Sequence, residues 1–91
     1  MQLGGVGQTI TEKLSKALEP HSLEVIDESH LHAGHAGARP EGETHFRVKI
    51  QSPAFEGKSL VQRHRMVNEV LADELKGPVH ALAISASVPA A

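Results

Sequence analysis

The 91-residue sequence contains no cysteine, no tryptophan and no tyrosine, and only two phenylalanines. Without cysteine, the chain can form no disulfide, supply no thiolate ligand and use no cysteine nucleophile. The scarcity of aromatic rings disfavours RNA-binding modules that stack several bases. No apolar run approaches the ~20 residues that a membrane-spanning helix needs. The net charge of −2 lacks the basic excess that is typical of strong non-specific nucleic-acid binding.

Histidine, in contrast, is abundant, with seven residues. Three of them, His30, His32 and His35, lie within residues 28–43, a stretch with glycines and a proline but no hydrophobic periodicity. We predict a long loop there, and loops of this length are usually functional or disordered. Imidazole is a common neutral metal ligand, so the cluster, with His45 two residues beyond Glu43, is compatible with metal binding. A solvated polar loop that happens to be rich in histidine explains the same pattern.

The remaining sequence predicts one α+β domain over residues 9–89, after a flexible tail at residues 1–8. A capping-box pattern, Thr9 to Glu12, predicts the start of a first helix, and Pro20 predicts its end. Alternating or short apolar runs predict strands at residues 23–27, 45–51 and 79–87. The second strand is expected to be half-buried, with one solvated face formed by His45, Arg47, Lys49 and Gln51. The first two strands are expected to form an antiparallel hairpin around the loop.

Between the second and third strands the sequence predicts helices. Ser59 and Gln62 form a second capping-box pattern. We expect a short helical turn near residues 59–63 and a longer helix that ends near Lys76, before Gly77 and Pro78. The apolar positions that define this stripe include Leu60, His64, Val67, Val70, Leu71 and Leu75. The predicted order is α-β-β-α-α-β, with the helices on one face of a three-stranded mixed sheet.

Two further features have both functional and structural explanations. His80 begins the last predicted strand in phase with Leu82 and Ile84, so it is either a ligand or a locally hydrogen-bonded strand residue. His64 lies on an apolar helix stripe and is expected to be half-buried. The basic run from Arg63 to Arg65 could contact phosphates, although acidic residues follow it closely and a solvated basic turn explains it equally well.

Several familiar motifs are incomplete. Gly57-Lys58-Ser59 resembles the end of a phosphate-binding loop, but that pattern requires glycine at position 52, where this chain has Ser52. The GXXG pattern of residues 34–37 lies between two predicted strands, whereas nucleic-acid-binding KH domains place it between two helices. We find no catalytic triad and no paired carboxylates, so we expect no enzyme activity.

Four segments of the chain together resemble the BolA family over residues 9–89. The His-rich stretch of residues 32–37 (HAGHAG) resembles alphaproteobacterial, plastid and mitochondrial members. The family fold is α-β-β-α-α-β and resembles class II KH domains, which agrees with the order predicted above. The four segments are residues 23–29 (LEVIDES), 43–48 (ETHFRV), 55–59 (FEGKS) with 63–68 (RHRMVN), and 79–84 (VHALAI).

The resemblance implies a partner and a cofactor. BolA proteins pair with monothiol glutaredoxins that have a CGFS motif, and the complex can bridge a [2Fe–2S] cluster. Glutaredoxin and glutathione supply the thiolates, and the BolA protein supplies His80 and a loop histidine, which is His32 or, alternatively, His35. The implied roles are iron–sulfur cluster trafficking, assembly, or iron and redox regulation. The chain is expected to be monomeric alone, in a bacterial cytoplasm or the interior of a plastid or mitochondrion.

The resemblance leaves one alternative function open. Some BolA proteins regulate transcription, so the resemblance also implies, as the alternative, a nucleic-acid-binding role through the KH-like helical region, with contacts from Lys49, Lys58, Arg63 and Arg65. The low net charge and scarce aromatics disfavour this role, and a His-rich zinc module that acts alone is a weaker alternative still. The residues expected to bind a partner or nucleic acid are Lys58, Arg63, His64, Arg65 and Asn68.

Overall fold

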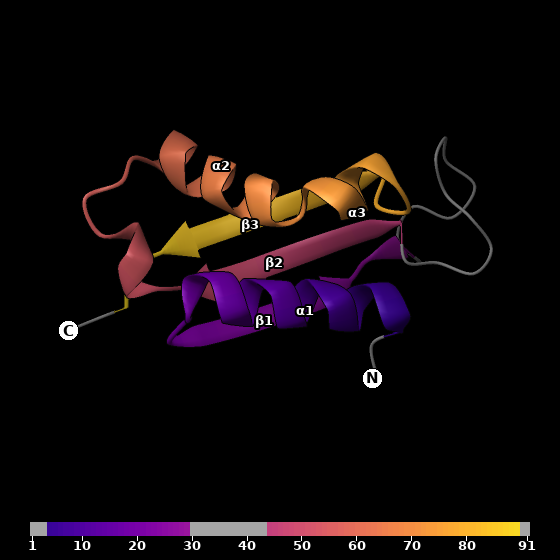
Figure 1. Cartoon of the computed structure of the whole chain (residues 1–91), viewed down its shortest axis with the longest axis horizontal. Coiled ribbons are helices and arrows are strands. Elements are labelled where there is room, and N and C mark those ends of the chain that lie inside the picture. The colour runs from indigo at the N-terminus through magenta and orange to yellow at the C-terminus, as the bar shows by residue number, and fades with distance from the viewer. Residues whose placement is uncertain (1–3, 30–43, 90–91) are drawn as a thin grey trace.

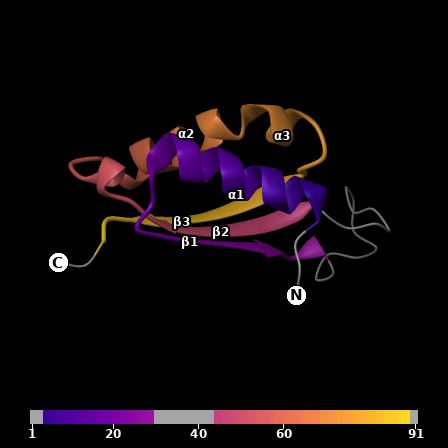
Figure 2. The same cartoon turned by 60° about the horizontal axis from the view of Figure 1, so that its bottom comes forward.

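The computed structural model describes residues 4–29 and 44–89, in which helices cover one face of a three-stranded sheet (Figures 1 and 2). The predicted order α-β-β-α-α-β is confirmed. The elements are α1 (Gly5–Leu18), β1 (Ser22–Asp27), β2 (His45–Gln51), the short 3-10 helix η2 (Pro53–Phe55), α2 (Leu60–Val70), α3 (Ala72–Lys76) and β3 (Ala81–Ser87).

The central strand β2 pairs with both other strands and so determines which segments of the chain lie side by side. It is antiparallel to β1, with Asp27 opposite Phe46, and parallel to β3, with His45 opposite Ala81. The predicted hairpin is therefore confirmed, and α2 with α3 forms the crossover that a parallel pair requires. As a consequence, the end of β1 and the beginnings of β2 and β3 lie at the same end of the sheet.

The hydrophobic core lies between the sheet and the helices. Phe46, Val48 and Ile50 alternate along β2 and are buried, whereas Arg47 and Lys49 on the opposite face are exposed. This pattern confirms the predicted half-buried strand, except that His45 was expected on the solvated face and is only 6% exposed. The other buried hydrophobic residues are Ile10, Leu14, Leu18, Phe55, Val67, Leu71, Val79 and Ala86.

The predicted start of the first helix is wrong. α1 begins at Gly5, so the hydroxyls of Thr9 and Thr11 donate to the carbonyls of Gly5 and Gly7, each at 2.9 Å, and do not cap the helix. The physical reason is packing, because Val6 contacts the core and extends the i, i+4 apolar stripe by one turn. The predicted end is confirmed, since the helix stops at Leu18, before Pro20.

The capping box at the start of α2 is confirmed, because the Ser59 side chain accepts from the Gln62 backbone and the Gln62 side chain accepts from the Ser59 backbone. The predicted division of the helical region is wrong. The longer helix comes first and the chain bends at Leu71, which is buried, so α3 has only five residues. Leu60, which was assigned to the apolar stripe, is 64% exposed because it occupies the first helical position.

Candidate functional site

Backbone hydrogen bonds fix His80 at the end of the sheet where β2 and β3 begin, on the right in Figure 1. The carbonyl of Thr44 accepts from the backbone N–H groups of His80, at 2.7 Å, and Ala81, at 3.1 Å. His80 therefore lies directly before β3, not within it as predicted, and its side chain is exposed. The arrangement presents an imidazole to solvent from a fixed backbone.

The His80 ring packs against a second histidine. The ring centroids of His45 and His80 are 5.3 Å apart, and the ring planes make an angle of 51°. The Nδ1 atom of His45 is 2.8 Å from the hydroxyl oxygen of Thr44. An exposed imidazole, which can bind a metal or a proton, thus lies against a buried one that is held in place.

A buried polar network supports this pair of rings. The hydroxyl oxygen of Ser29 accepts from the backbone N–H groups of Thr44, at 2.8 Å, and His45, at 3.1 Å. The backbone N–H of Ser29 donates to the Asp27 carboxylate at 2.9 Å. No buried side-chain nitrogen or oxygen of the described residues lacks a hydrogen-bond partner. Since satisfied buried networks are rigid, Ser29 and Thr44 hold together the two described ends of the chain that flank residues 30–43.

Charged groups beside the network are paired. The carboxylate of Glu28 accepts from the Arg47 guanidinium at 3.0 Å, and its backbone N–H donates to the His45 carbonyl at 2.7 Å. The Glu28 side chain therefore balances the positive charge of Arg47 on the open face of β2. Within residues 4–29 and 44–89, no three His, Asp or Glu side chains gather closely enough to hold a metal ion.

The predicted site residues are placed as follows. His80 lies at the exposed edge described above, whereas His32 and His35, with His30, lie outside the described residues. His45 was grouped with the loop histidines but was not assigned as a ligand, and the structure brings it to His80. The alternation along β2 gave no signal for this contact, because it arises only from the parallel pairing of β2 with β3.

The basic run at the start of α2 has a structural role. The Arg63 side chain donates to the carbonyls of Lys58, at 3.0 Å, and Ala86, at 3.2 Å, so it links α2 to the end of β3. His64 is half-buried, as predicted, whereas Lys58, Arg65 and Asn68 are exposed. Because Ala86 and His80 lie at opposite ends of β3, Arg63 is remote from the histidine pair.

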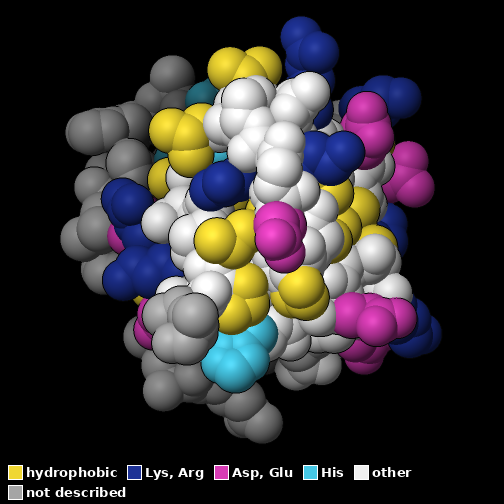
Figure 3. All heavy atoms as spheres, turned by 90° about the vertical axis from the view of Figure 1, so that its left-hand side faces the viewer, with side chains coloured by type: hydrophobic (Ala, Val, Ile, Leu, Met, Phe, Trp, Pro, Cys, Tyr) yellow, Lys and Arg dark blue, Asp and Glu magenta, His cyan; other side chains and the backbone are white. Residues whose placement is uncertain are grey.

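The end of the molecule that contains the start of α2 has a mixed surface. Figure 3 shows basic, acidic and apolar side chains next to one another there. The exposed apolar residues Leu60 and Val61 belong to this region of the chain. A mixed surface does not favour the alternative of a phosphate-binding face, which requires a concentration of positive charge.

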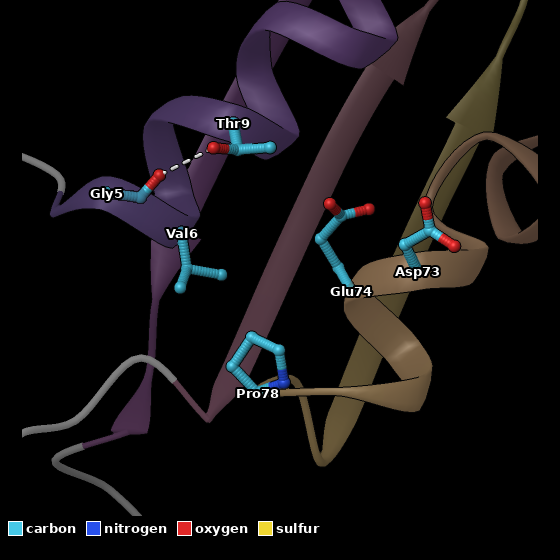
Figure 4. A pocket seen from close by; sticks show the side chains of 6 residues that line it. All are labelled: Gly5, Val6, Thr9, Asp73, Glu74 and Pro78. Atoms are coloured by element: carbon cyan, nitrogen blue, oxygen red, sulfur yellow. Dashed lines mark hydrogen bonds between the residues drawn. The ribbon is translucent and has the colours of Figure 1, made fainter.

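A hollow of about 480 Å³ lies between the start of α1 and α3 (Figure 4). Lys13 bridges the same two helices, with its ammonium nitrogen 2.8 Å from the Glu74 carboxylate and 3.9 Å from that of Asp73. The hydrogen bond to Glu74, reinforced by both negative charges, raises the pKa of Lys13, although desolvation opposes this shift. This ion pair connects α1 to α3. The residues that line the hollow are Gly5, Val6, Thr9, Asp73, Glu74 and Pro78.

The helices of the described part of the chain are all too short or too polar to cross a membrane.

Comparison with known proteins identifies the family. The profile of the BolA-like protein family matches residues 14–91. The chain is 54% identical over 92 residues to SufE-like protein 1, chloroplastic/mitochondrial, of Arabidopsis thaliana, a match that covers 97% of this chain and 25% of that protein. It is 54% identical over 87 residues to BolA-like protein 1 of Mus musculus, which covers 96% of this chain and 61% of that protein.

Solved structures support the same assignment. The structure of the BolA domain of SufE1 from Arabidopsis thaliana matches with a TM-score of 0.88 and 53% sequence identity, over 97% of this chain and 96% of that chain. The chain spans less than two thirds of the length of the two relatives named above. Fold, sequence and the four segments that first indicated the resemblance agree, and the chain belongs to the BolA-like protein family.

Proposed function

We propose that this chain is a binding partner of CGFS monothiol glutaredoxins and provides the His80 imidazole to a [2Fe–2S] cluster bridged between the two proteins. The observation that supports this most directly is the exposed side chain of His80 on a backbone fixed by Thr44. A ligand at an exposed edge is accessible to a cluster that arrives on another protein. The role is one of binding and transfer, not of catalysis.

The donor chemistry of the chain fits a shared cluster. The sequence has no cysteine, so this chain can provide no thiolate, and the thiolates come from the glutaredoxin cysteine and glutathione. Replacing thiolate by neutral imidazole removes negative charge from the cluster and raises its reduction potential. Because a metal-bound histidine must be deprotonated, protons compete with ligation at acidic pH.

We assign the second nitrogen ligand to His32, with His35 as the alternative. His32 follows Ser29 by three residues, so chain connectivity alone keeps the two Cα atoms within ~11 Å of each other. Ser29 in turn is hydrogen-bonded to Thr44, whose carbonyl holds the backbone of His80. The sequence therefore provides loop histidines within a short chain distance of the histidine pair.

The cellular role that follows is iron–sulfur cluster trafficking, assembly, or iron and redox regulation. The relatives named chloroplastic or mitochondrial favour an organelle interior. In a bacterial source the corresponding compartment is the cytoplasm.

Anaerobic co-purification with a CGFS glutaredoxin, in the presence of glutathione and an iron–sulfur source, tests the proposal. We expect a heterocomplex with visible [2Fe–2S] absorbance, and a glutaredoxin with serine in place of the CGFS cysteine serves as the control that loses it. Because this chain has no tryptophan and no tyrosine, its own near-ultraviolet background is small, and the cluster absorbance is easy to follow. A stable cluster on the isolated chain, without glutaredoxin or glutathione, would contradict the proposal, as would the failure of the two proteins to form a cluster-loaded complex.

A further inference from the structure

We infer that His45 is a positioning residue for His80, which it holds in one orientation before any partner binds. This inference rests on the proposed ligand role of His80 and deepens it. His45 itself needs no contact with the cluster to act in this way. Its effect is exerted through the ring of its neighbour.

His45 is suited to this role because its own position is fixed on several sides. Its backbone N–H donates to the Ser29 hydroxyl at 3.1 Å, and its carbonyl accepts from the Glu28 N–H at 2.7 Å. Its ring nitrogen Nδ1 lies 2.8 Å from the Thr44 hydroxyl, and the residue is only 6% exposed. The ring of His45 is therefore a rigid surface.

His80 has the opposite character. Its backbone is held by the Thr44 carbonyl at 2.7 Å, but its side chain is exposed. An exposed side chain on a fixed backbone normally samples more than one staggered rotamer. A ring centroid separation of 5.3 Å with tilted planes falls within the range in which aromatic rings attract one another. The contact with His45 thus favours one orientation of the His80 ring.

Thr44 connects the two histidines. Its carbonyl holds the His80 backbone, and its hydroxyl holds the His45 ring. Both parts of the arrangement therefore depend on one residue, which Ser29 fixes in turn. A ligand that is ordered before binding loses less conformational entropy when it binds, so the orientation strengthens cluster binding.

The first test uses NMR of the isolated, isotope-labelled chain and needs no cluster. We expect His45→Ala to abolish the ring-to-ring NOEs and to change the His80 χ1 couplings to those of a rotating side chain, while the backbone amide spectrum stays folded. His45→Phe, which keeps an aromatic ring, should restore a single His80 orientation. His21→Ala, at an exposed position before β1 at the opposite end of the sheet, is the matched control and should leave His80 unchanged. A single, wild-type orientation of His80 in His45→Ala would overturn the inference, as would a rotating His80 in His45→Phe.

A variant at Thr44 keeps the test decisive if His45→Ala does not fold. Thr44→Val retains the volume and the backbone bonds but removes the hydroxyl beside the His45 ring. We expect both rings to lose their fixed orientation in this variant, because the buried Nδ1 of His45 loses the Thr44 hydroxyl, whereas the phenyl ring of His45→Phe has no polar atom that needs a partner. Retention of the wild-type χ1 couplings of His80 in Thr44→Val would contradict the inference.

The second test titrates each variant against cluster-loaded CGFS glutaredoxin. His45→Ala should weaken binding about three- to tenfold, the effect of leaving one side chain unordered, and His45→Phe should bind within about twofold of wild type. The proposed ligand role of His80 and the inferred positioning role of His45 are contradicted by different results. If His80→Ala retains the cluster, the proposed function fails, whatever the NMR result. If His80→Ala loses the cluster but His45→Ala keeps both an ordered His80 and full affinity, only the inference about His45 fails.

Discussion

The hydroxyl oxygen of Ser29 accepts a hydrogen bond from the backbone N–H of Thr44 at 2.8 Å, across the two described ends of the hairpin β1–β2. The same oxygen accepts from the N–H of His45 at 3.1 Å. One small side chain thus satisfies two buried backbone donors beside the histidine pair. Since an unsatisfied buried donor is costly, the stability of this end of the sheet depends on Ser29.

Ser29→Ala should therefore destabilise the fold by about 1–3 kcal/mol, because two buried N–H groups lose their acceptor. Urea denaturation followed by circular dichroism measures the change. Ser85, which is exposed on β3, provides the control, and Ser85→Ala should stay within about 0.5 kcal/mol of wild type. An equally small effect of Ser29→Ala would show that the hydroxyl is not a structural acceptor.

Ser59→Ala should cost about 1 kcal/mol, because it removes the side-chain acceptor of the capping box at the start of α2. Ser59→Asp, which can still accept from the Gln62 N–H, should recover most of this loss. Thermal or urea unfolding of both variants gives the comparison. Equal stabilities of the Ala and Asp variants would mean that the cap contributes nothing.

The ion pair between Lys13 and Glu74 should stabilise the fold at neutral pH and not at strongly alkaline pH. Hydrogen bonding to Glu74 raises the pKa of Lys13 in the folded state, with nearby negative charge acting in the same direction and desolvation against it. A raised folded pKa gives stability that is fully present below the unfolded value of about 10.4 and is lost as pH rises through the folded value.

Lys13→Met should accordingly be less stable than wild type at pH 7, and the difference should shrink above pH ~10.4. Lys16→Met, at an exposed position of the same helix, should show no such pH dependence. Urea unfolding of the three proteins at several pH values gives the required curves. A Lys13→Met difference that stays constant across this range would exclude the ion pair as its cause.

Removal of single loop histidines should have less effect than removal of both. His35 follows His32 by only three residues, so it provides a second imidazole in the same segment. We expect His32→Ala to change the visible spectrum and lability of the shared cluster without abolishing it. The double variant at His32 and His35 should be much worse than either single variant. If the double variant equals His32→Ala in cluster stability, His35 is not an alternative ligand.

Most of the fold was predictable because local signals dominate it. The alternation of Phe46, Val48 and Ile50 predicted β2, and the spacing of Ser59 and Gln62 predicted the start of α2. The start of α1 was not predictable from propensity, since glycines disfavour helix and tertiary packing of Val6 stabilises the first turn. The bend at Leu71 has no proline or glycine in the sequence to indicate it.

The candidate site was only partly predictable, because some of its contacts join segments that are far apart in the sequence. His80 had a signal in the sequence, namely its place at the start of an apolar run. The contact of His45 with His80 had none, because it depends on the parallel pairing of β2 with β3 across a long crossover. Arg63 likewise was expected to face a partner, but it donates to the Ala86 carbonyl on a distant strand. Long-range register, which a single sequence does not specify, decides both roles.

Titration of cluster-loaded CGFS glutaredoxin with wild type, His80→Ala and His21→Ala, followed by visible circular dichroism, tests the central claim most directly. Wild type and His21→Ala should produce the same cluster spectrum, because His21 is an exposed residue before β1, at the end of the sheet opposite His80. His80→Ala should fail to produce that spectrum, or should form a cluster that decays much faster. A wild-type spectrum and lifetime with His80→Ala would show that His80 is a structural residue and not a cluster ligand.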